Sequence, residues 1–114
     1  MNLVFKIVSS TEWRAAEAAG VFAGAAVDRA DGYIHFSTAA QAPETARLHF
    51  AGQADLVLLR IDAGTLGEAL KWEPSRGGQL FPHLYGPLDC ALVEAVTPIS
   101  LDQDGIPQLG ELTP

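Results

Sequence analysis

Polar residues able to do chemistry gather in two segments of the sequence, DGYIHFST at residues 31–38 and WEPSRGGQLFPHLYG at residues 72–86. In the first segment His35 alternates with Ile34 and Phe36, so its ring should point away from the face that those two side chains bury. Two interpretations stay open for such a histidine. It contacts a ligand in a cleft, or it is half-buried and bonded to a backbone carbonyl.

Ser37 and Thr38 lie where the pattern changes from a strand to a helix. At such a junction, hydroxyl groups and the free N–H groups of the first helical turn can bind an anion or a ligand carbonyl. Capping of the helix explains Thr38 equally well. Ser37 is not required for the cap, which makes it the better candidate for a ligand contact.

In the second segment, Arg76 stands beside Gly77 and Gly78. A guanidinium next to residues that permit positive φ and close backbone approach suits a phosphate or a carboxylate. The competing interpretation is an ion pair with Glu73 or Asp31 that braces the loop. We expect Arg76 to be the anchor for an anion.

Two more polar side chains, His83 and Tyr85, belong to a turn stiffened by prolines. Their apolar bodies and polar tips suit a small-molecule pocket. The alternative is a structural loop that packs on the domain without binding a ligand. If a site exists, His83 and Tyr85 should converge with His35, Ser37 and Arg76 around one concave pocket.

The remaining histidine and the cysteine favour structural roles. His49 lies late in the second predicted helix, where a histidine interacts with the final carbonyl groups. The three histidines lack the i, i+4 or HxH spacing of metal ligands, so no metal site is expected. Cys90 has apolar neighbours and no adjacent histidine or lysine, which indicates a buried, unreactive thiol.

The chain has 114 residues, of which 48% are hydrophobic, and this suffices for one core and predicts a single domain over residues 1–114. Its net charge of −7 opposes binding to nucleic acid or to an anionic membrane, but leaves room for a local site for a small anion. The N-terminus has no signal-peptide pattern, and no segment is long and apolar enough to span a bilayer. With one cysteine, these features predict a cytoplasmic protein.

Hydrophobic periodicity predicts an α+β fold with a mixed, largely antiparallel sheet and two main helices. The strands are expected near residues 3–8, 33–37, 55–61 and 91–97, and the helices near 10–19 and 39–51. A capping box between Ser9 and Glu12 starts the first helix. We expect a loop at residues 21–32, and an ordered loop without regular structure at residues 74–87, which hold three prolines and three glycines.

Six motifs follow one another along nearly the whole chain: VFKI at 4–7, Trp13 with Gly20, DGYIHFSTAAQ at 31–41, FAG at 50–52, DLVLL at 55–59 and WEPSRGGQLFPHLYGPL at 72–88. In this order they resemble the bacterial family catalogued as domain of unknown function 952. That family is similar in fold to the ADP-ribosyltransferases, which implies a split antiparallel β arrangement with a cleft for a nicotinamide dinucleotide. The HFST motif resembles the strand that carries a Ser-Thr-Ser motif in one branch of those enzymes.

The resemblance implies NAD or a related nucleotide as the ligand. Lys6 or Arg76 would then neutralise its phosphates, Ser37 would help to hold the nicotinamide ribose, and Tyr85 would stack on the nicotinamide ring. The residues expected to bind the cofactor are Lys6, Ser37, Thr38, Arg76, His83 and Tyr85.

By the same resemblance, His35 and Glu94 would be the catalytic residues of an ADP-ribosyl transfer. His35 would hold the nicotinamide ribose, and Glu94 would stabilise the positive ribose centre left as nicotinamide departs. Two other functions stay open. In one, the chain is a binding module whose pocket takes an anionic or nucleotide-like metabolite without catalysis; in the other, it is a structural partner domain.

Overall fold

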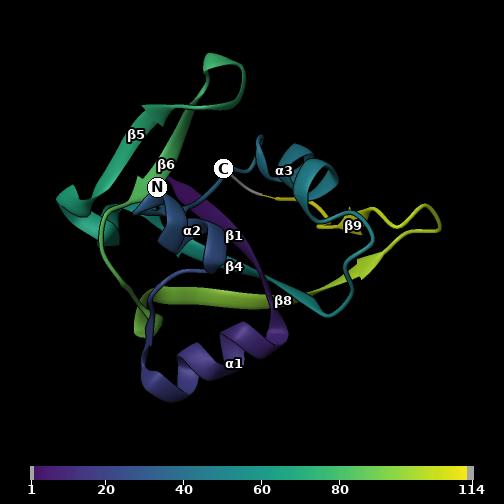
Figure 1. The fold of residues 1–114 in the computed structure, drawn as a ribbon, viewed down its shortest axis with the longest axis horizontal. Helices are drawn as coiled ribbons and strands as arrows, with labels where there is room; N and C mark the ends of the chain where they lie inside the picture. Colours follow the sequence, from purple (N-terminus) through teal and green to yellow (C-terminus); the bar gives the residue numbers. More distant parts are fainter. Residues whose placement is uncertain (1, 113–114) are drawn as a thin grey trace.

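A computed structural model describes residues 2–112 as an α+β fold made of small antiparallel sheets and short helices (Figure 1). The strands are β1 (Leu3–Ser9), β2 (Val21–Phe22), β3 (Ile34–His35), β4 (Leu56–Asp62), β5 (Leu70–Pro74), β6 (Leu80–Leu84), β7 (Leu88–Asp89), β8 (Val93–Leu101) and β9 (Pro107–Gln108). The α-helices are α1 (Ser10–Ala19), α2 (Ala26–Asp31) and α3 (Ala42–His49), and the 3-10 turns are η1 (Ala63–Ala69), η2 (Arg76–Gly78) and η3 (Cys90–Leu92). Among residues 2–112, no helix is long and apolar enough to cross a bilayer.

The strands form one four-stranded sheet in the order β1-β4-β8-β9, one three-stranded sheet in the order β3-β6-β5, and the small pair β2-β7. Every pairing is antiparallel, so the expected largely antiparallel arrangement is confirmed. A single bridge joins the two larger sheets: the Phe5 and Ser37 backbones exchange hydrogen bonds of 2.7 and 2.9 Å. Beyond this bridge β1 and β3 part, which splits the sheet.

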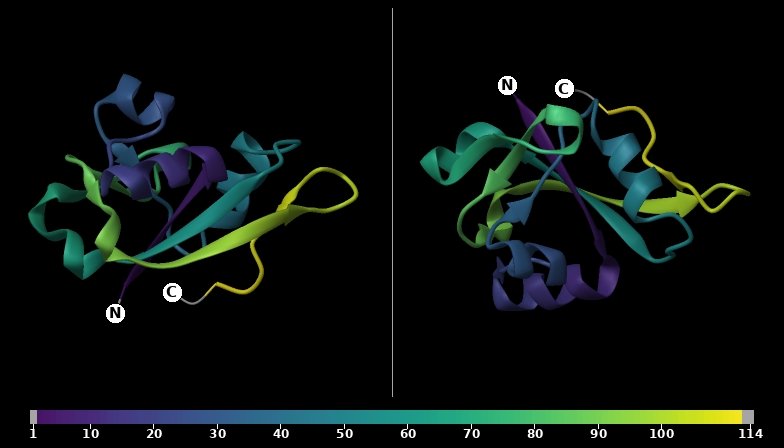
Figure 2. Two further views of the ribbon diagram at one scale, coloured as in Figure 1. Left: turned by 90° about the horizontal axis from the view of Figure 1, so that it is seen from below. Right: turned by 45° about the horizontal axis from the view of Figure 1, so that its top comes forward.

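Strands β1 and β4 are buried on both faces because α1 and α3 pack on opposite sides of them (Figure 2). On one side Trp13 and Ala16 of α1 pack with alternate residues of the two strands, and on the other side Ala42 and Ala46 of α3 do the same. This explains why the strand at 56–62 has a continuous apolar run. Lys6 is the polar exception in β1, and it is 7% exposed.

Helix α1 follows the prediction at both ends. The Ser9 side chain accepts a 3.1 Å hydrogen bond from the Glu12 backbone N–H, and Gly20 closes the helix with φ of 83°. The helix expected at 39–51 is shorter, Ala42–His49, because Thr38 and Gln41 first form a turn with two reciprocal hydrogen bonds of 3.0 and 3.2 Å. Thr38 is therefore a capping residue.

Three expectations about secondary structure were wrong. The segment at 21–32 holds β2 and α2 in place of a loop. The segment at 74–87 holds the 3-10 turn η2 and strand β6, which pairs with β5. In β6, Pro82 accepts a 3.0 Å hydrogen bond at its carbonyl from the Phe36 N–H, where the β3 ladder ends. Strand β8 continues past Pro98 to Leu101, because it is paired only with β4 at this point and a proline is tolerated at an edge.

A buried ion pair ties α2 to β1. The Lys6 ammonium lies 3.1 Å from the Asp28 carboxylate, which is 1% exposed, and it also donates a 2.9 Å hydrogen bond to the His35 carbonyl. The same carboxylate accepts hydrogen bonds from the backbone N–H groups of Ala25 at 2.8 Å and His35 at 3.0 Å. Asp28 thus connects β1, α2 and β3.

Burial shifts the pKa values of this pair. Burial raises the pKa of the Asp28 carboxyl, but the Lys6 charge and the hydrogen bonds from His35 and Ala25 together outweigh it, and the pKa lies below its usual range. For Lys6, burial lowers the pKa of the ammonium more than the attraction of Asp28 raises it. The ionised form of each side chain is therefore stabilised by its partner.

We expect Asp28→Asn to lower the free energy of unfolding by about 3 kcal/mol, because the substitution leaves the Lys6 ammonium buried without its counter-charge. Urea denaturation at neutral pH measures this loss. Asp104→Asn is the matched control, since Asp104 is exposed in the turn before β9, and it should change stability by less than about 0.5 kcal/mol. A loss under about 1 kcal/mol in Asp28→Asn would contradict the role assigned to the pair.

The pH dependence has a defined sign. Because folding lowers the pKa of Asp28 below its ordinary 3.8, its stabilising contribution is complete above that pH and is lost as the pH falls through the folded value. Acid titration of stability should therefore show a smaller loss below about pH 4 in Asp28→Asn than in the wild type.

Gly24 should tolerate no side chain. Its φ is 110°, and a Cβ there would lie 2.9 Å from the Cβ of Asp28. We expect Gly24→Ala to cost about 2–4 kcal/mol, the sum of backbone strain and steric overlap. Gly20→Ala is the control, because Gly20 has φ of 83° with no atom near the added Cβ, and it should cost about 1 kcal/mol. Equal losses for the two variants in urea denaturation would show that contact with Asp28 is unimportant.

Candidate functional site

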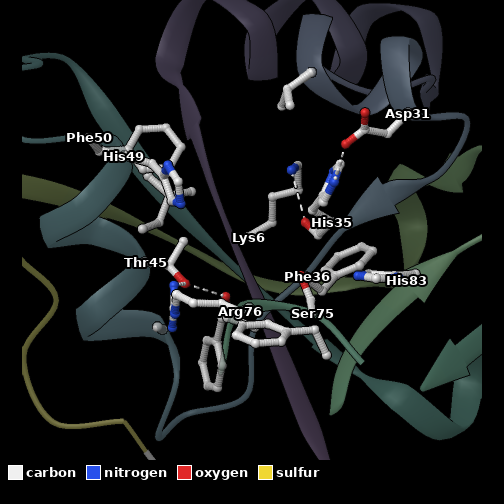
Figure 3. A pocket seen from close by; sticks show the side chains of 16 residues that line it. Lys6, Asp31, His35, Phe36, Thr45, His49, Phe50, Ser75, Arg76 and His83 are labelled. Carbon is white, nitrogen blue, oxygen red and sulfur yellow. Dashed lines mark hydrogen bonds and ion pairs between the residues drawn. The ribbon is translucent and has the colours of Figure 1, made fainter. Parts of the chain in front are cut away.

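A pocket of about 540 Å³ lies where β1 and β3 part, enclosed by α2, α3 and the β5–β6 hairpin (Figure 3). Its volume is within the range of small-molecule sites in proteins. Five of the residues selected from the sequence line it: Lys6, His35, Ser37, Arg76 and His83. Residues up to seventy-seven positions apart in sequence are thus brought to one cavity by the fold.

Three of the selected residues do not line this pocket. Thr38 caps the turn before α3. Tyr85 is 45% exposed and donates a 2.7 Å hydrogen bond to Glu73, so it is not placed to stack on a ligand ring in the pocket. Glu94 is exposed on β8, which β4 separates from β1, so its carboxylate is too remote to stabilise a reacting centre there.

Both ring nitrogens of His35 are occupied. Nδ1 lies 2.6 Å from the Asp28 carboxylate and Nε2 lies 2.9 Å from the Asp31 carboxylate. A neutral imidazole has one N–H, so the ring donates to both carboxylates only as the imidazolium. Neither proposed sequence interpretation describes this arrangement: the ring lines the pocket, but the structure leaves no nitrogen of His35 open to a ligand.

Lys6 also differs from its expected role. It lines the pocket, yet its ammonium is committed to Asp28 and to the His35 carbonyl. The charge that would neutralise a phosphate is therefore already compensated. Among the lining residues, Arg76 is left as the strongest candidate to bind an anion.

The Arg76 guanidinium lies over the Phe81 ring, 4.9 Å from its centroid, and donates a 3.2 Å hydrogen bond to the Thr45 hydroxyl. That hydroxyl shares a 3.0 Å hydrogen bond with the Ser37 hydroxyl. In the part of the chain that the structure describes, no carboxylate lies within ion-pair distance of Arg76. The expected alternative, an ion pair with Glu73 or Asp31, is wrong because both acids bind histidines.

His83 is buried in the pocket wall, 3% exposed, and is held from two sides. Its Nδ1 lies 2.7 Å from a Glu73 carboxylate oxygen, and the Tyr33 ring stacks on it with centroids 4.1 Å apart. The hydrogen bonds from His83 and from the Tyr85 hydroxyl lower the pKa of Glu73. Burial and the nearby acids Asp31 and Glu73 raise the pKa of the Tyr33 phenol.

The other ring nitrogen of His83, Nε2, has no hydrogen-bond partner among residues 2–112. Within that range no fully buried side-chain nitrogen or oxygen lacks a partner, so Nε2 is in contact with solvent. His83 lines the pocket, and Nε2 is its one ring nitrogen without a partner among residues 2–112. The open nitrogen makes His83 more available for chemistry than His35.

Sequence reasoning missed several residues of the site. Thr45 and His49 line the pocket from one face of α3, and their i, i+4 spacing was the signal that could have paired them. His49 therefore belongs to the pocket and not only to the helix end. Glu73 is diagonal to His83 across the β5–β6 ladder, a relation visible only once the hairpin is known. Tyr33 shares a strand face with His35 by alternation, and their ring centroids are 4.6 Å apart, whereas Asp28 carried no signal of its own.

The arrangement suits an organic anion better than a metal. Arg76, with the hydroxyls of Ser37 and Thr45, can hold a phosphate or a carboxylate group. Among the described residues, no group of three or more His, Cys, Asp or Glu side chains is arranged to hold a metal ion. Cys90 is away from the pocket, and burial raises the pKa of its thiol.

Comparison with known proteins gives a family and a fold. The crystal structure of protein CC0527 from Caulobacter crescentus is 57% identical over 94% of both chains, with a TM-score of 0.92. The solution NMR structure of CC0527 matches 96% of this chain and 95% of its own, again at 57% identity, with a TM-score of 0.87. No curated protein matches this chain. A family model described as "Protein of unknown function (DUF952)" matches residues 7–96, and the chain therefore belongs to the DUF952 family.

Proposed function

We propose that this protein binds a small anionic, nucleotide-like ligand in the pocket between β1, α3 and the β5–β6 hairpin, with NAD as the first ligand to test. One observation carries the proposal: Arg76 lines the pocket with a guanidinium that has no carboxylate partner among the described residues. A guanidinium stacked on an aromatic ring and half-buried binds a phosphate in two parallel hydrogen bonds. The hydroxyls of Ser37 and Thr45 offer further polar contacts.

Local charge supports an anion in spite of the chain's net charge of −7. Among residues 2–112, the pocket wall contains Arg76 and three histidines, whereas Asp31 is its only carboxylate, and that carboxylate is bonded to His35. Distant acids act weakly, because exposed charges are screened beyond about 8–10 Å at ordinary ionic strength. The pocket can therefore attract an anion that the protein surface as a whole would repel.

ADP-ribosyl transfer is the second candidate function that we propose for this pocket. The open Nε2 of His83 favours it, because a general base or a ribose contact needs an accessible nitrogen. Against it stands the position of Glu94 outside the pocket, which leaves no free carboxylate to stabilise the ribose centre. Binding without turnover is therefore the function that we place first.

Isothermal titration and thermal denaturation with NAD, ADP-ribose and AMP test the proposal. A ligand at 100 times its dissociation constant should raise the free energy of unfolding by about 2.7 kcal/mol. Release of labelled nicotinamide from NAD then separates transfer or hydrolysis from binding alone. If none of the three nucleotides binds, the nucleotide proposal fails and a structural role becomes the better explanation.

Arg76→Lys should lower the affinity for such a nucleotide at least about tenfold while leaving the thermal midpoint nearly unchanged, because lysine keeps the charge but loses the planar fork. Arg60→Lys is the matched control, since Arg60 is exposed on β4 and does not line the pocket. Unchanged affinity together with a lowered midpoint in Arg76→Lys would assign Arg76 to bracing the hairpin and would remove the anion anchor.

A further inference from the structure

The pocket has two chemically different ends. Figure 3 shows Arg76 and Thr45 on the side of α3, and His35 and His83 on the other side of Lys6. The first end carries the Arg76 guanidinium, which has no carboxylate within ion-pair distance among residues 2–112. A hydrogen bond from Arg47 and, more weakly, the charge of Arg76 lower the pKa of the nearby Glu44. At the second end His83 carries an open nitrogen on a buried ring. A ligand that fills the pocket must match both ends.

Glu73 determines what the open nitrogen of His83 can do. The carboxylate oxygen 2.7 Å from Nδ1 also accepts the Tyr85 hydroxyl at 2.7 Å. These hydrogen bonds lower the pKa of Glu73, so the carboxylate is ionised near neutral pH and has no proton to donate. The proton between Glu73 and Nδ1 must then belong to the imidazole, and in the neutral ring Nε2 presents a lone pair.

Stacking fixes the plane of the ring as well as its tautomer. Tyr33 lies against His83 with an interplanar angle of 28°, and Tyr85 packs on Tyr33 with centroids 5.2 Å apart. A ring held by a carboxylate at one nitrogen and by an aromatic face has little freedom to turn Nδ1 toward the pocket. The direction of the Nε2 lone pair is therefore set before a ligand arrives.

We propose that Glu73 is a positioning residue that makes Nε2 of His83 a hydrogen-bond acceptor, so that the ligand places a hydroxyl group there while its anionic group binds Arg76. The proposal deepens the function proposed above and rests on it, because it assumes that a ligand occupies this pocket. It adds a requirement that an anion alone does not meet.

The chemistry of the two ends suits a sugar phosphate unit, which carries an anionic group and hydroxyl groups in one molecule. Phe81, which lies under the Arg76 guanidinium, and His83 both line the pocket and are two residues apart on β6. Two residues along a strand span roughly 7 Å, so a ligand that contacts both ends must be longer than a lone phosphate. The sugar phosphate unit is shared by free sugar phosphates and by nucleotides.

The tautomer of His83 can be measured without any ligand. Long-range proton–nitrogen correlation spectra of the full chain at pH 8, above the range in which histidines usually protonate, should show Nδ1 protonated and Nε2 bare. Glu73→Ala should redistribute the tautomers, whereas Glu68→Ala, at an exposed acid outside the pocket, should not. A wild-type ring protonated at Nε2 would overturn the proposal.

The hydroxyl requirement is tested with two phosphate esters, ribose 5-phosphate and tetrahydrofurfuryl phosphate, which has the same ring without hydroxyls. The wild type should bind the first at least about tenfold more tightly, because the second leaves Nε2 without a donor. In Glu73→Ala the ratio should fall to within about threefold, while Glu68→Ala should keep it. A purely structural role of Glu73 would weaken both esters alike and leave the ratio unchanged.

The outcomes separate this inference from the nucleotide proposal. Equal affinities of the two esters in the wild type, an unchanged ratio in Glu73→Ala, or no binding of either ester would overturn the inference even if NAD binds. Discrimination between the esters without binding of NAD would sustain the inference and remove the nucleotide proposal. If Glu73→Ala does not fold, the wild-type tautomer and the wild-type ester ratio decide the matter.

Discussion

The buried pair of Lys6 and Asp28 is the interaction on which the rest of the site depends. A carboxylate that is 1% exposed is tolerable only if its charge and its lone pairs are satisfied, and here donors from β1, from the N-cap of α2 and from β3 meet at this group of α2. Because these bonds come from three separate elements, they hold α2 against the sheet. They also fix His35, whose backbone and ring both contact Asp28.

The split between the two larger sheets creates the space for a ligand. Strand β1 pairs along its length with β4 on one side, but on the other side it touches the Ser37 backbone at a single bridge. Backbone groups of β1 beyond that bridge have no neighbouring strand there, and side chains from α2, α3 and the β5–β6 hairpin line the gap. The pocket is thus a consequence of how the strands diverge.

Two histidines in one pocket are given different properties by their neighbours. His35 lies between two carboxylates and has no open nitrogen, whereas His83 has one carboxylate, one stacked ring and one nitrogen in contact with solvent. The same side chain is therefore a structural and electrostatic element in one position and a reachable polar atom in the other. The hydrogen-bond partners of each ring, and not residue type, separate the two roles.

Local patterns in the sequence were enough to predict helix α1 and the buried strands β1 and β4, and to select Arg76 and His83, both of which line the pocket. These features depend on neighbours within a few residues: a capping box, an apolar run, or a guanidinium beside two glycines. Strand β6 was missed because prolines disfavour regular structure locally, and only the structure shows that Pro82 lies where the β3 ladder ends, with its carbonyl bonded to the Phe36 N–H.

The fold class, the family and five of the polar residues that line the pocket could be predicted from the sequence. The contacts that each of these residues makes are visible only in the folded structure. The Lys6 ammonium, which was expected to neutralise a phosphate, is bonded to Asp28. Glu94 lies on a strand away from the pocket, and Glu73 holds the ring of His83. The physical reason is that the charge, tautomer and exposure of a side chain depend on partners distant in sequence, and no local pattern encodes those partners.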